Sequence, residues 1–200
     1  PLNGGQSYLI PSVGKDKLMR DPSICQAPDG TFHMVWTSSW TDRIIGHASS
    51  RDLIHWSEQQ AIPVMIHEPT AHNCWAPKLF YDEPSQTYYI FWATTIPGRH
   101  KEIPTSESEK GLNHRIYYVT TKDFCTFSKT KMFFNPDFSV IDAAIVKDPK
   151  LGDLIMIVKN ENSNPPEKNL RVTRTKKIEK GFPTKVSAPI TGKYWAEGPA

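Results

Sequence analysis

The chain has 200 residues, 38% of them hydrophobic and 22% charged, so it is long enough to bury a sizeable core and does not resemble a disordered segment. Its net charge of +3 is too small to indicate a nucleic-acid or membrane partner, and no apolar run approaches the roughly 20 residues of a membrane-spanning helix. The cysteines form no Cys-x-x-Cys pair, and Cys25, Cys74 and Cys125 are expected to be small buried apolar residues.

Turn residues between apolar stretches predict a series of β-hairpins. Over 23–36, alternating apolar and polar residues flank Asp29-Gly30, where glycine supplies the positive φ of a tight turn. The same order of apolar stretch, turn and apolar stretch returns over 78–92 and 144–158. Helical spacing is not sustained in any segment. The chain is therefore predicted to be all-β.

Two later segments repeat one another and indicate further strands in each unit. Residues 49–56 and 120–127 both place a hydroxyl pair, a base and an aspartate before an apolar residue, and then an aromatic residue. Asp52 and Asp123 are expected to close turns through hydrogen bonds to the backbone, and Trp56 and Phe127 to pack between sheets. These repeats predict a four-stranded unit that occurs at least twice. An insertion at 97–111 reads as a loop at the end of the sheet that carries the acids, and is expected to form part of the site rim.

Four short motifs each precede a predicted strand. They are Arg-Asp-Pro-Ser-Ile at 20–24, Trp-Ala-Pro at 75–77, Ile-Asp-Ala at 141–143 and Glu-Gly-Pro at 197–199. When 21, 76, 142 and 197 are taken as equivalent positions, the units begin near Asp21, Ala76, Asp142 and Glu197, spaced 55, 66 and 55 residues apart. A repeat of this length predicts a radially repeated β-sheet protein that gathers carboxylates on its axis.

Other kinds of site fit the sequence less well. The histidines of 67–72 are five residues apart with Pro69 between them, so they cannot share a helical face as zinc ligands, and a loop is expected there. The sequence contains no Gly-x-Ser-x-Gly elbow and no glycine-rich phosphate loop. Basic residues between 168 and 185, including Lys168, lack interleaved aromatic residues and are expected to form a solvated face.

The three carboxylates are left as the candidates for chemistry. Asp21, Asp142 and Glu197 would meet across a central depression, as hydrolysis of a glycosidic bond requires: one protonated acid for the leaving oxygen and one ionised base for water. The field of a third carboxylate would raise the pKa of the acid and keep it protonated.

At these four motifs the sequence resembles glycoside hydrolase family 43, the five-bladed β-propeller glycosidases. The resemblance runs from about residue 19 to 200 and implies that Asp21 is the general base, Asp142 the pKa modulator and Glu197 the general acid. It implies a hydrolase that removes terminal α-L-arabinofuranosyl or β-D-xylosyl units from plant polysaccharides or oligosaccharides, typically with inversion. Candidate substrate-binding residues are Trp75, Trp40, Trp195 and Arg20, whose positions would border the pocket.

The expected domain is an incomplete β-propeller catalytic domain over 1–200, with about three blades and the start of a fourth. The remaining blades are expected outside this chain, and Pro1 reads as the edge of a processed or excised fragment. The reaction requires no cofactor, and the resemblance allows a structural calcium for which the sequence supplies no ligand cluster. Secretion or a periplasmic location follows from the resemblance only. A retaining or phosphorolytic propeller glycosidase and a non-catalytic carbohydrate-binding propeller stay open as alternatives.

Overall fold

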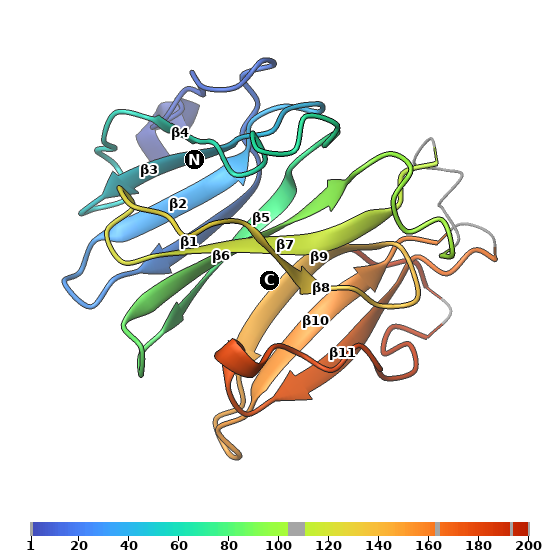
Figure 1. Cartoon of the computed structure of the whole chain (residues 1–200). Coiled ribbons are helices and arrows are strands. Elements are labelled where there is room, and N and C mark those ends of the chain that lie inside the picture. Colours follow the sequence, from blue (N-terminus) through green and yellow to red (C-terminus); the bar gives the residue numbers. More distant parts are fainter. Residues whose placement is uncertain (1, 104–110, 163–164, 193, 200) are drawn as a thin grey trace.

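Three antiparallel sheets make up the computed structural model, which describes residues 2–103, 111–162, 165–192 and 194–199 (Figure 1). The first sheet contains β1 (Arg20–Gln26), β2 (Phe32–Thr37), β3 (Ile45–Ser50) and β4 (Gln60–Ile62), each paired with the next. The second contains β5 (Trp75–Asp82), β6 (Thr87–Thr95), β7 (His114–Thr121) and β8 (Lys131–Phe134) in the same order. The third contains β9 (Val140–Lys147), β10 (Leu154–Asn160) and β11 (Asn169–Thr175). Within the described residues, the only helical turns are short 3₁₀ turns at Leu2–Gly5 and Ile178–Lys180.

Each sheet corresponds to one unit of the sequence repeat, and the predicted all-β class is confirmed. The predicted hairpins over 23–36, 78–92 and 144–158 are β1–β2, β5–β6 and β9–β10. In the first, Gly30 has a φ of 84°, and the Asp29 carboxylate accepts a hydrogen bond of 2.9 Å from the backbone N–H of Thr31. Residues 194–199 carry the fourth motif without a strand, and the expected start of a fourth unit stays a prediction.

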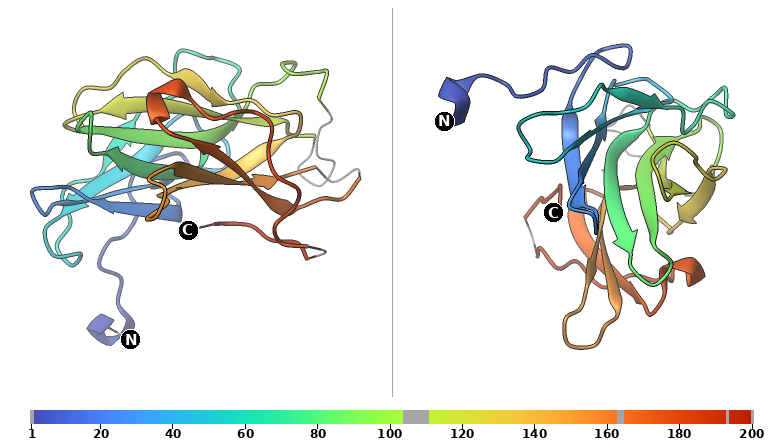
Figure 2. Two further views of the ribbon diagram at one scale, coloured as in Figure 1. Left: turned by 90° about the horizontal axis from the view of Figure 1, so that it is seen from below. Right: turned by 90° about the vertical axis from the view of Figure 1, so that its left-hand side faces the viewer.

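The first strand of each sheet faces the other sheets rather than lying at the outside. β1 contacts β5, and β5 contacts β9, so the beginnings of the three units lie near one another (Figures 1 and 2). The first residues of the chain extend away from the sheets, as both views in Figure 2 show. The arrangement of the first strands is what allows distant sequence motifs to share one site.

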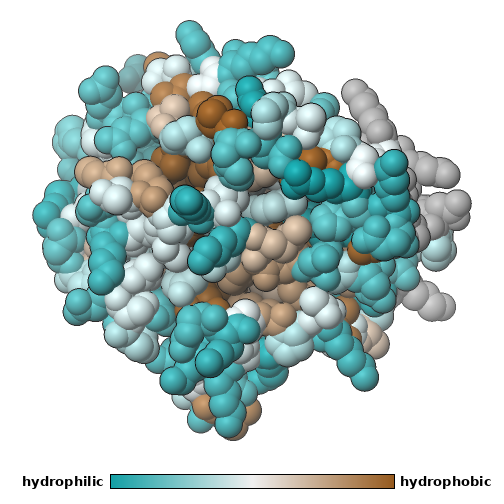
Figure 3. All heavy atoms as spheres, in the orientation of Figure 1, coloured by the Kyte–Doolittle hydropathy of each residue, from teal (hydrophilic) through white to brown (hydrophobic). Residues whose placement is uncertain are grey.

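Alternate faces of β6 fill the two main cores. Ile90 and Trp92 pack with Val35 and Ile45 of the first sheet, whereas Phe91 packs with side chains of the third sheet. Because successive residues of a strand point to opposite faces, a strand buried on both sides reads as a continuous apolar run, as the sequence 88–92 does. The outer surface in the view of Figure 3 is mostly hydrophilic, with smaller apolar patches between the sheets.

The repeated turns have the architectural role that the sequence predicts. The Asp52 carboxylate accepts hydrogen bonds of 2.9 and 2.8 Å from the backbone N–H groups two and three residues further along the chain. Asp123 accepts the equivalent bonds, also at 2.9 and 2.8 Å. Isolated bridges join Ser50 to Trp56 and Thr121 to Phe127 at equivalent places. The expectation for the cysteines holds only in part, because Cys74 is buried, Cys25 is half-buried and Cys125, in the second of these turns, is exposed.

Candidate active site

An unusual backbone conformation marks the beginning of all three units. Asp21, Ala76 and Asp142 have φ values of 50°, 47° and 51°, which non-glycine residues rarely adopt. Each lies at an irregularity in the register of its hairpin, as in a β-bulge. Ala76 shares this conformation without a carboxylate. The conformation therefore belongs to the architecture of the repeated unit rather than to the carboxylates.

The fourth motif follows the same pattern with an offset of one residue. Gly198, with a φ of 61°, is its left-handed residue and precedes a proline, as Asp21 and Ala76 do. Glu197 therefore lies one position before the place that corresponds to Asp21, and not at the equivalent position that the spacing suggested.

A threonine links the first two units. The hydroxyl of Thr37, at the end of β2, accepts a hydrogen bond of 2.8 Å from the N–H of Ala76 and donates one of 3.4 Å to the carboxylate of Asp21. Thr37 is buried, whereas Asp21 is exposed. The base predicted from the sequence is thus held by its neighbour and open to water.

Asp142 lies close to both other predicted acids. Its carboxylate accepts a hydrogen bond of 3.1 Å from the N–H of Gly198, which ties the fourth motif to the third sheet. Burial raises the pKa of Asp142; the hydrogen bond from Gly198 and the charge of Lys159 work against this, and the negative charges of Asp21 and Glu197 add to it. Residues from positions 21, 142 and 197 are therefore brought into one electrostatic neighbourhood.

Glu197 differs from the expectation in its protonation. Its side chain is 74% exposed and receives a hydrogen bond of 2.6 Å from the ammonium group of Lys159. This bond and the positive charge of Lys159 lower the pKa of Glu197, and Lys168 and Arg20 lower it further. The prediction that a neighbouring carboxylate raises the pKa of the acid is wrong for Glu197, because the positive charge of Lys159 outweighs the negative charge of Asp142.

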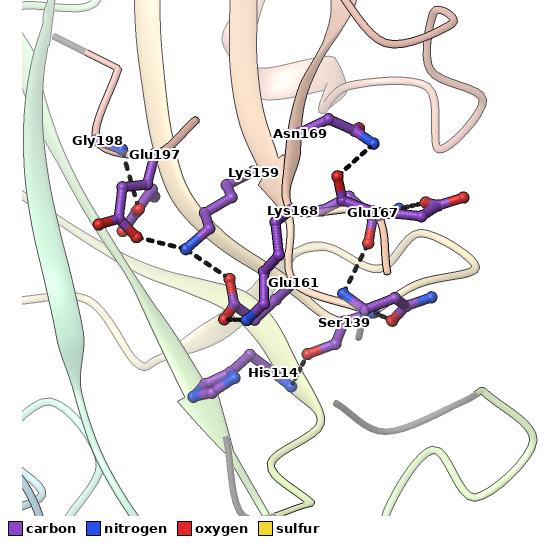
Figure 4. A network of polar contacts seen from close by, with 12 residues as sticks. His114, Ser139, Lys159, Glu161, Glu167, Lys168, Asn169, Glu197 and Gly198 are labelled. Atoms are coloured by element: carbon purple, nitrogen blue, oxygen red, sulfur yellow. Dashed lines mark hydrogen bonds and ion pairs between the residues drawn. The ribbon is translucent and has the colours of Figure 1, made fainter. Parts of the chain in front are cut away.

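Lys159 belongs to a buried ionic network that the sequence did not reveal (Figure 4). It lies at the end of β10 and pairs with Ile141, beside Asp142. Its ammonium group contacts the Glu161 carboxylate at 2.8 Å, and Lys168 makes an ion pair with the other oxygen of Glu161. Lys168 is thus buried, and its assignment to a solvated basic face was wrong. The available signal was the change from apolar residues to Lys-Asn-Glu at the end of the apolar run 154–158.

Three of the predicted substrate-binding residues lie together. The guanidinium of Arg20 lies over the Trp40 ring at 4.4 Å from its centroid. The indole N–H of Trp75 donates a hydrogen bond of 2.9 Å to the backbone oxygen of Trp40, and the two rings meet edge to face at 6.0 Å. The side chain of Trp195 is exposed and makes no ring contact with them in the described part of the chain.

A buried histidine packs against the ring of Trp75. His114, at the start of β7, lies 5.1 Å from the Trp75 ring and is fully buried. The amide oxygen of Asn73 accepts the N–H of Thr95, so its amide nitrogen donates to Nε2 of His114 at 2.9 Å. Burial lowers the pKa of His114 to about 3, which keeps the ring neutral. The sequence alone gave no reason to select Asn73 or His114.

The insertion at 97–111 is described at its two ends only, because 104–110 lie outside the described residues. At the near end, the Asn113 amide donates hydrogen bonds of 2.8 and 3.2 Å to the backbone oxygens of His100 and Ile103. These bonds tie residues 100–103 to the residue that precedes His114. The proposed role of the loop as a site rim stays a prediction.

The described residues contain no group of three or more His, Cys, Asp or Glu side chains that could hold a metal ion. The calcium that the resemblance allows therefore has no fitting set of ligands here, and no step of chemistry is derived from it. Among the same residues, none of the helices has the length and apolarity to cross a membrane.

Comparisons with known proteins agree with this fold. The α-L-arabinofuranosidase of Bifidobacterium longum subsp. longum is 23% identical over a match that covers 72% of this chain and 15% of the relative. The exo-β-1,3-galactanase from Phanerochaete chrysosporium superposes with a TM-score of 0.60 at 16% identity, over 86% of this chain and 39% of that one. The α-L-arabinofuranosidase from Lactobacillus brevis gives 0.57 at 14% identity, over 86% and 52%. At these identities the structural likeness shows the fold alone.

The family comparison covers much more of the chain. A family described as a probable glycosyl hydrolase domain matches residues 1–196. This match confirms the resemblance that the four motifs carry. The chain therefore belongs to the family of probable glycosyl hydrolase domains related to glycoside hydrolase family 43.

Proposed function

We propose that the protein is a glycoside hydrolase that removes terminal α-L-arabinofuranosyl or β-D-xylosyl units from plant polysaccharides or oligosaccharides, with inversion of the anomeric centre. One observation carries the proposal: Asp142 binds the backbone of Gly198 and lies within electrostatic reach of Asp21 and Glu197. A shared site for three distant carboxylates has a direct use in glycoside hydrolysis, where one acid and one base must flank the scissile bond.

In this mechanism Asp21 is the general base. Its carboxylate is exposed and the Thr37 hydroxyl orients it, so it can take a proton from the attacking water. Glu197 is assigned as the general acid. Because Lys159 lowers its pKa, its carboxyl must first take up a proton from water, which it then gives to the leaving oxygen. Asp142 holds the backbone of Gly198 and is assigned as the group that tunes Glu197 through its charge.

Substrate recognition is assigned to the aromatic group beside the acids. The rings of Trp40 and Trp75 offer apolar faces on which the C–H groups of a sugar can pack, and Arg20 adds a cation that can donate to sugar hydroxyls. Trp195 precedes Glu197 by two residues, and its exposed ring is proposed to contact the substrate from the other side.

The wider architecture that we propose is a five-bladed β-propeller, of which the three sheets are blades. The contacts of β1 with β5 and of β5 with β9 support this, because the first strand of each blade lines the axis of a propeller. The four-stranded sheets β1–β4 and β5–β8 have the usual size of a blade.

Replacing Asp21 and Glu197 by their amides tests the two catalytic assignments. Asp21→Asn and Glu197→Gln in the full-length protein should each lower kcat by about 100- to 10,000-fold, because each removes a proton acceptor or donor of the transition state. The measurement is turnover of aryl α-L-arabinofuranosides, β-D-xylosides and β-D-galactosides. Glu58→Gln, a matched change at an exposed position, should leave turnover unchanged.

Proton NMR of the first-formed product then distinguishes the mechanisms. Inversion gives the opposite anomer, whereas the same anomer would indicate a retaining enzyme, and a sugar phosphate formed only with added phosphate would indicate phosphorolysis. Binding of oligosaccharides without turnover of any glycoside would contradict the proposed hydrolase and favour a carbohydrate-binding propeller.

A further inference from the structure

The ionic network behind Glu197 has no role in the mechanism so far. Lys159 is 5% exposed and Glu161 is fully buried, so both charged groups have left water. Burying charge costs free energy unless each ion finds a partner of good geometry. A network of this kind within reach of a proposed acid therefore invites a functional explanation, which rests here on the proposed role of Glu197.

Glu197 adds a carboxylate to the network. Lys159 and Lys168 both contact Glu161. Glu197 supplies a second negative charge through its contact of 2.6 Å with Lys159. Asp142 also lies within electrostatic reach of Lys159. The ammonium group of Lys159 is thus surrounded by carboxylates from β9, from the end of β10 and from the fourth motif.

The position of Glu197 depends on two separate contacts. The N–H of Gly198 fixes the backbone of the fourth motif to Asp142, and Lys159 fixes the side chain of Glu197 (Figure 4). With 74% of its side chain exposed, Glu197 has little packing to restrict its rotamers. The contact with Lys159 is therefore the main restraint on where the carboxyl group points.

We propose that Lys159 is a positioning residue for the acid: its ammonium group fixes the Glu197 carboxyl beside Asp142, while Glu161, which is itself paired with Lys168, holds that ammonium group from behind. The direction of the pKa shifts fits this role. Burial alone would lower the pKa of Lys159, but its bonds to Glu161 and Glu197 raise it, so the cation persists over the whole working range of pH. Lys159 makes the largest contribution to the low pKa of Glu197, ahead of Lys168 and Arg20.

A substitution that removes the charge should therefore change the ionisation of Glu197. In Lys159→Met the pKa of Glu197 should rise by roughly one unit, near the lower end of the range for a carboxyl beside a cation, since the group is largely exposed. The basic limb of kcat/KM should move to higher pH by the same amount, and kcat should fall with little change in KM. Glu161 keeps Lys168 as its partner in this variant, so no buried carboxylate is left unpaired.

Titration of Glu197 by ¹³C NMR of carboxyl-labelled full-length protein tests this without relying on activity. The resonance is assigned by its loss in Glu197→Gln. In Lys159→Arg the pKa of Glu197 should stay near that in the original protein. Lys147→Met, a matched change at an exposed lysine of β9, should leave the titration of Glu197 unchanged. If circular dichroism shows that Lys159→Met does not fold, Lys159→Gln is used in its place, because glutamine can still bond to Glu161.

The outcomes separate this proposal from the proposed function. A rise in the pKa of Glu197 in a protein that hydrolyses no glycoside would support the positioning role and contradict the hydrolase. An unchanged pKa of Glu197 in both neutral variants would overturn the positioning role, even with full glycosidase activity. A uniform loss of activity with no movement of the basic limb would also contradict it, because that is the result of a purely structural lysine.

Discussion

At the scale of single residues, Thr37 connects stability to the site. Thr37→Val should destabilise the full-length protein by about 1–3 kcal/mol, because the N–H of Ala76 would remain buried without its acceptor. Urea unfolding measures this loss. Thr37→Ser keeps the hydroxyl and loses one methyl group, so it should cost less; a Thr37→Val protein as stable as the original would contradict the hydrogen-bond explanation.

Single residues also set the limit of what the sequence could predict about the site. Asp21, Asp142 and Glu197 were selectable because each stands in a short motif, and repetition of a motif is visible in one sequence. Lys159 and Glu161 stand in no such motif. Lys159 contacts Glu197, 38 residues away, and Glu161 contacts Lys168, seven residues away. The first of these contacts exists only because the fourth motif packs on β10. The low pKa of Glu197 could not be predicted for the same reason.

At the scale of elements, the pairing of β2 with β3 depends on the absence of a side chain. Gly46 lies opposite Trp36, and a Cβ at position 46 would come within 2.1 Å of the Trp36 ring. Gly46→Ala should therefore destabilise the full-length protein by about 1–3 kcal/mol through overpacking.

A double-mutant cycle checks that explanation by urea unfolding. Trp36→Phe makes room at position 46, so the added cost of Gly46→Ala should be smaller in that background. Costs that simply add would show that the tryptophan ring is not the cause. The sequence gave no indication of the contact between Trp36 and Gly46, because that contact depends on the register between two strands.

The hairpins themselves were predictable for a local reason. Asp29-Gly30 and the turns of 82–85 and 148–152 place residues with strong turn preferences between alternating apolar stretches, and both signals act over a few residues. The fourth motif shares only the backbone signal: Gly198 adopts the same left-handed conformation as Asp21.

At the scale of the whole molecule, the convergence of the units is the property on which the site depends. Spacing in the sequence predicted that the first strands would meet, and the contacts of β1 with β5 and of β5 with β9 agree with it. The spacing could not predict the one-residue offset of Glu197, because an interval of 55 and one of 56 are indistinguishable without the backbone conformation.

Buried histidines give the whole molecule a dependence on pH. Burial lowers the pKa of His114 to about 3 and of His47 to about 4, and it lowers the pKa of His33 and His100 as well. Below pH 6.5 the unfolded chain binds protons that the folded chain does not, so the free energy of unfolding must fall as the pH is lowered from 7 towards 4. The raised pKa of Asp142 acts in the opposite direction and offsets part of this fall.

Urea unfolding of the full-length protein at pH 7 and pH 5 measures the effect. Each histidine that stays neutral contributes up to about 1.4 kcal/mol per pH unit below its unfolded pKa. His47→Gln should reduce the change in the free energy of unfolding between the two pH values by about the contribution of one histidine, since glutamine does not titrate and His47 is buried. Equal stability at the two pH values would contradict the explanation, because these histidines would then have to take up their protons in the folded state; for His114, the bond from Asn73 to Nε2 argues against this.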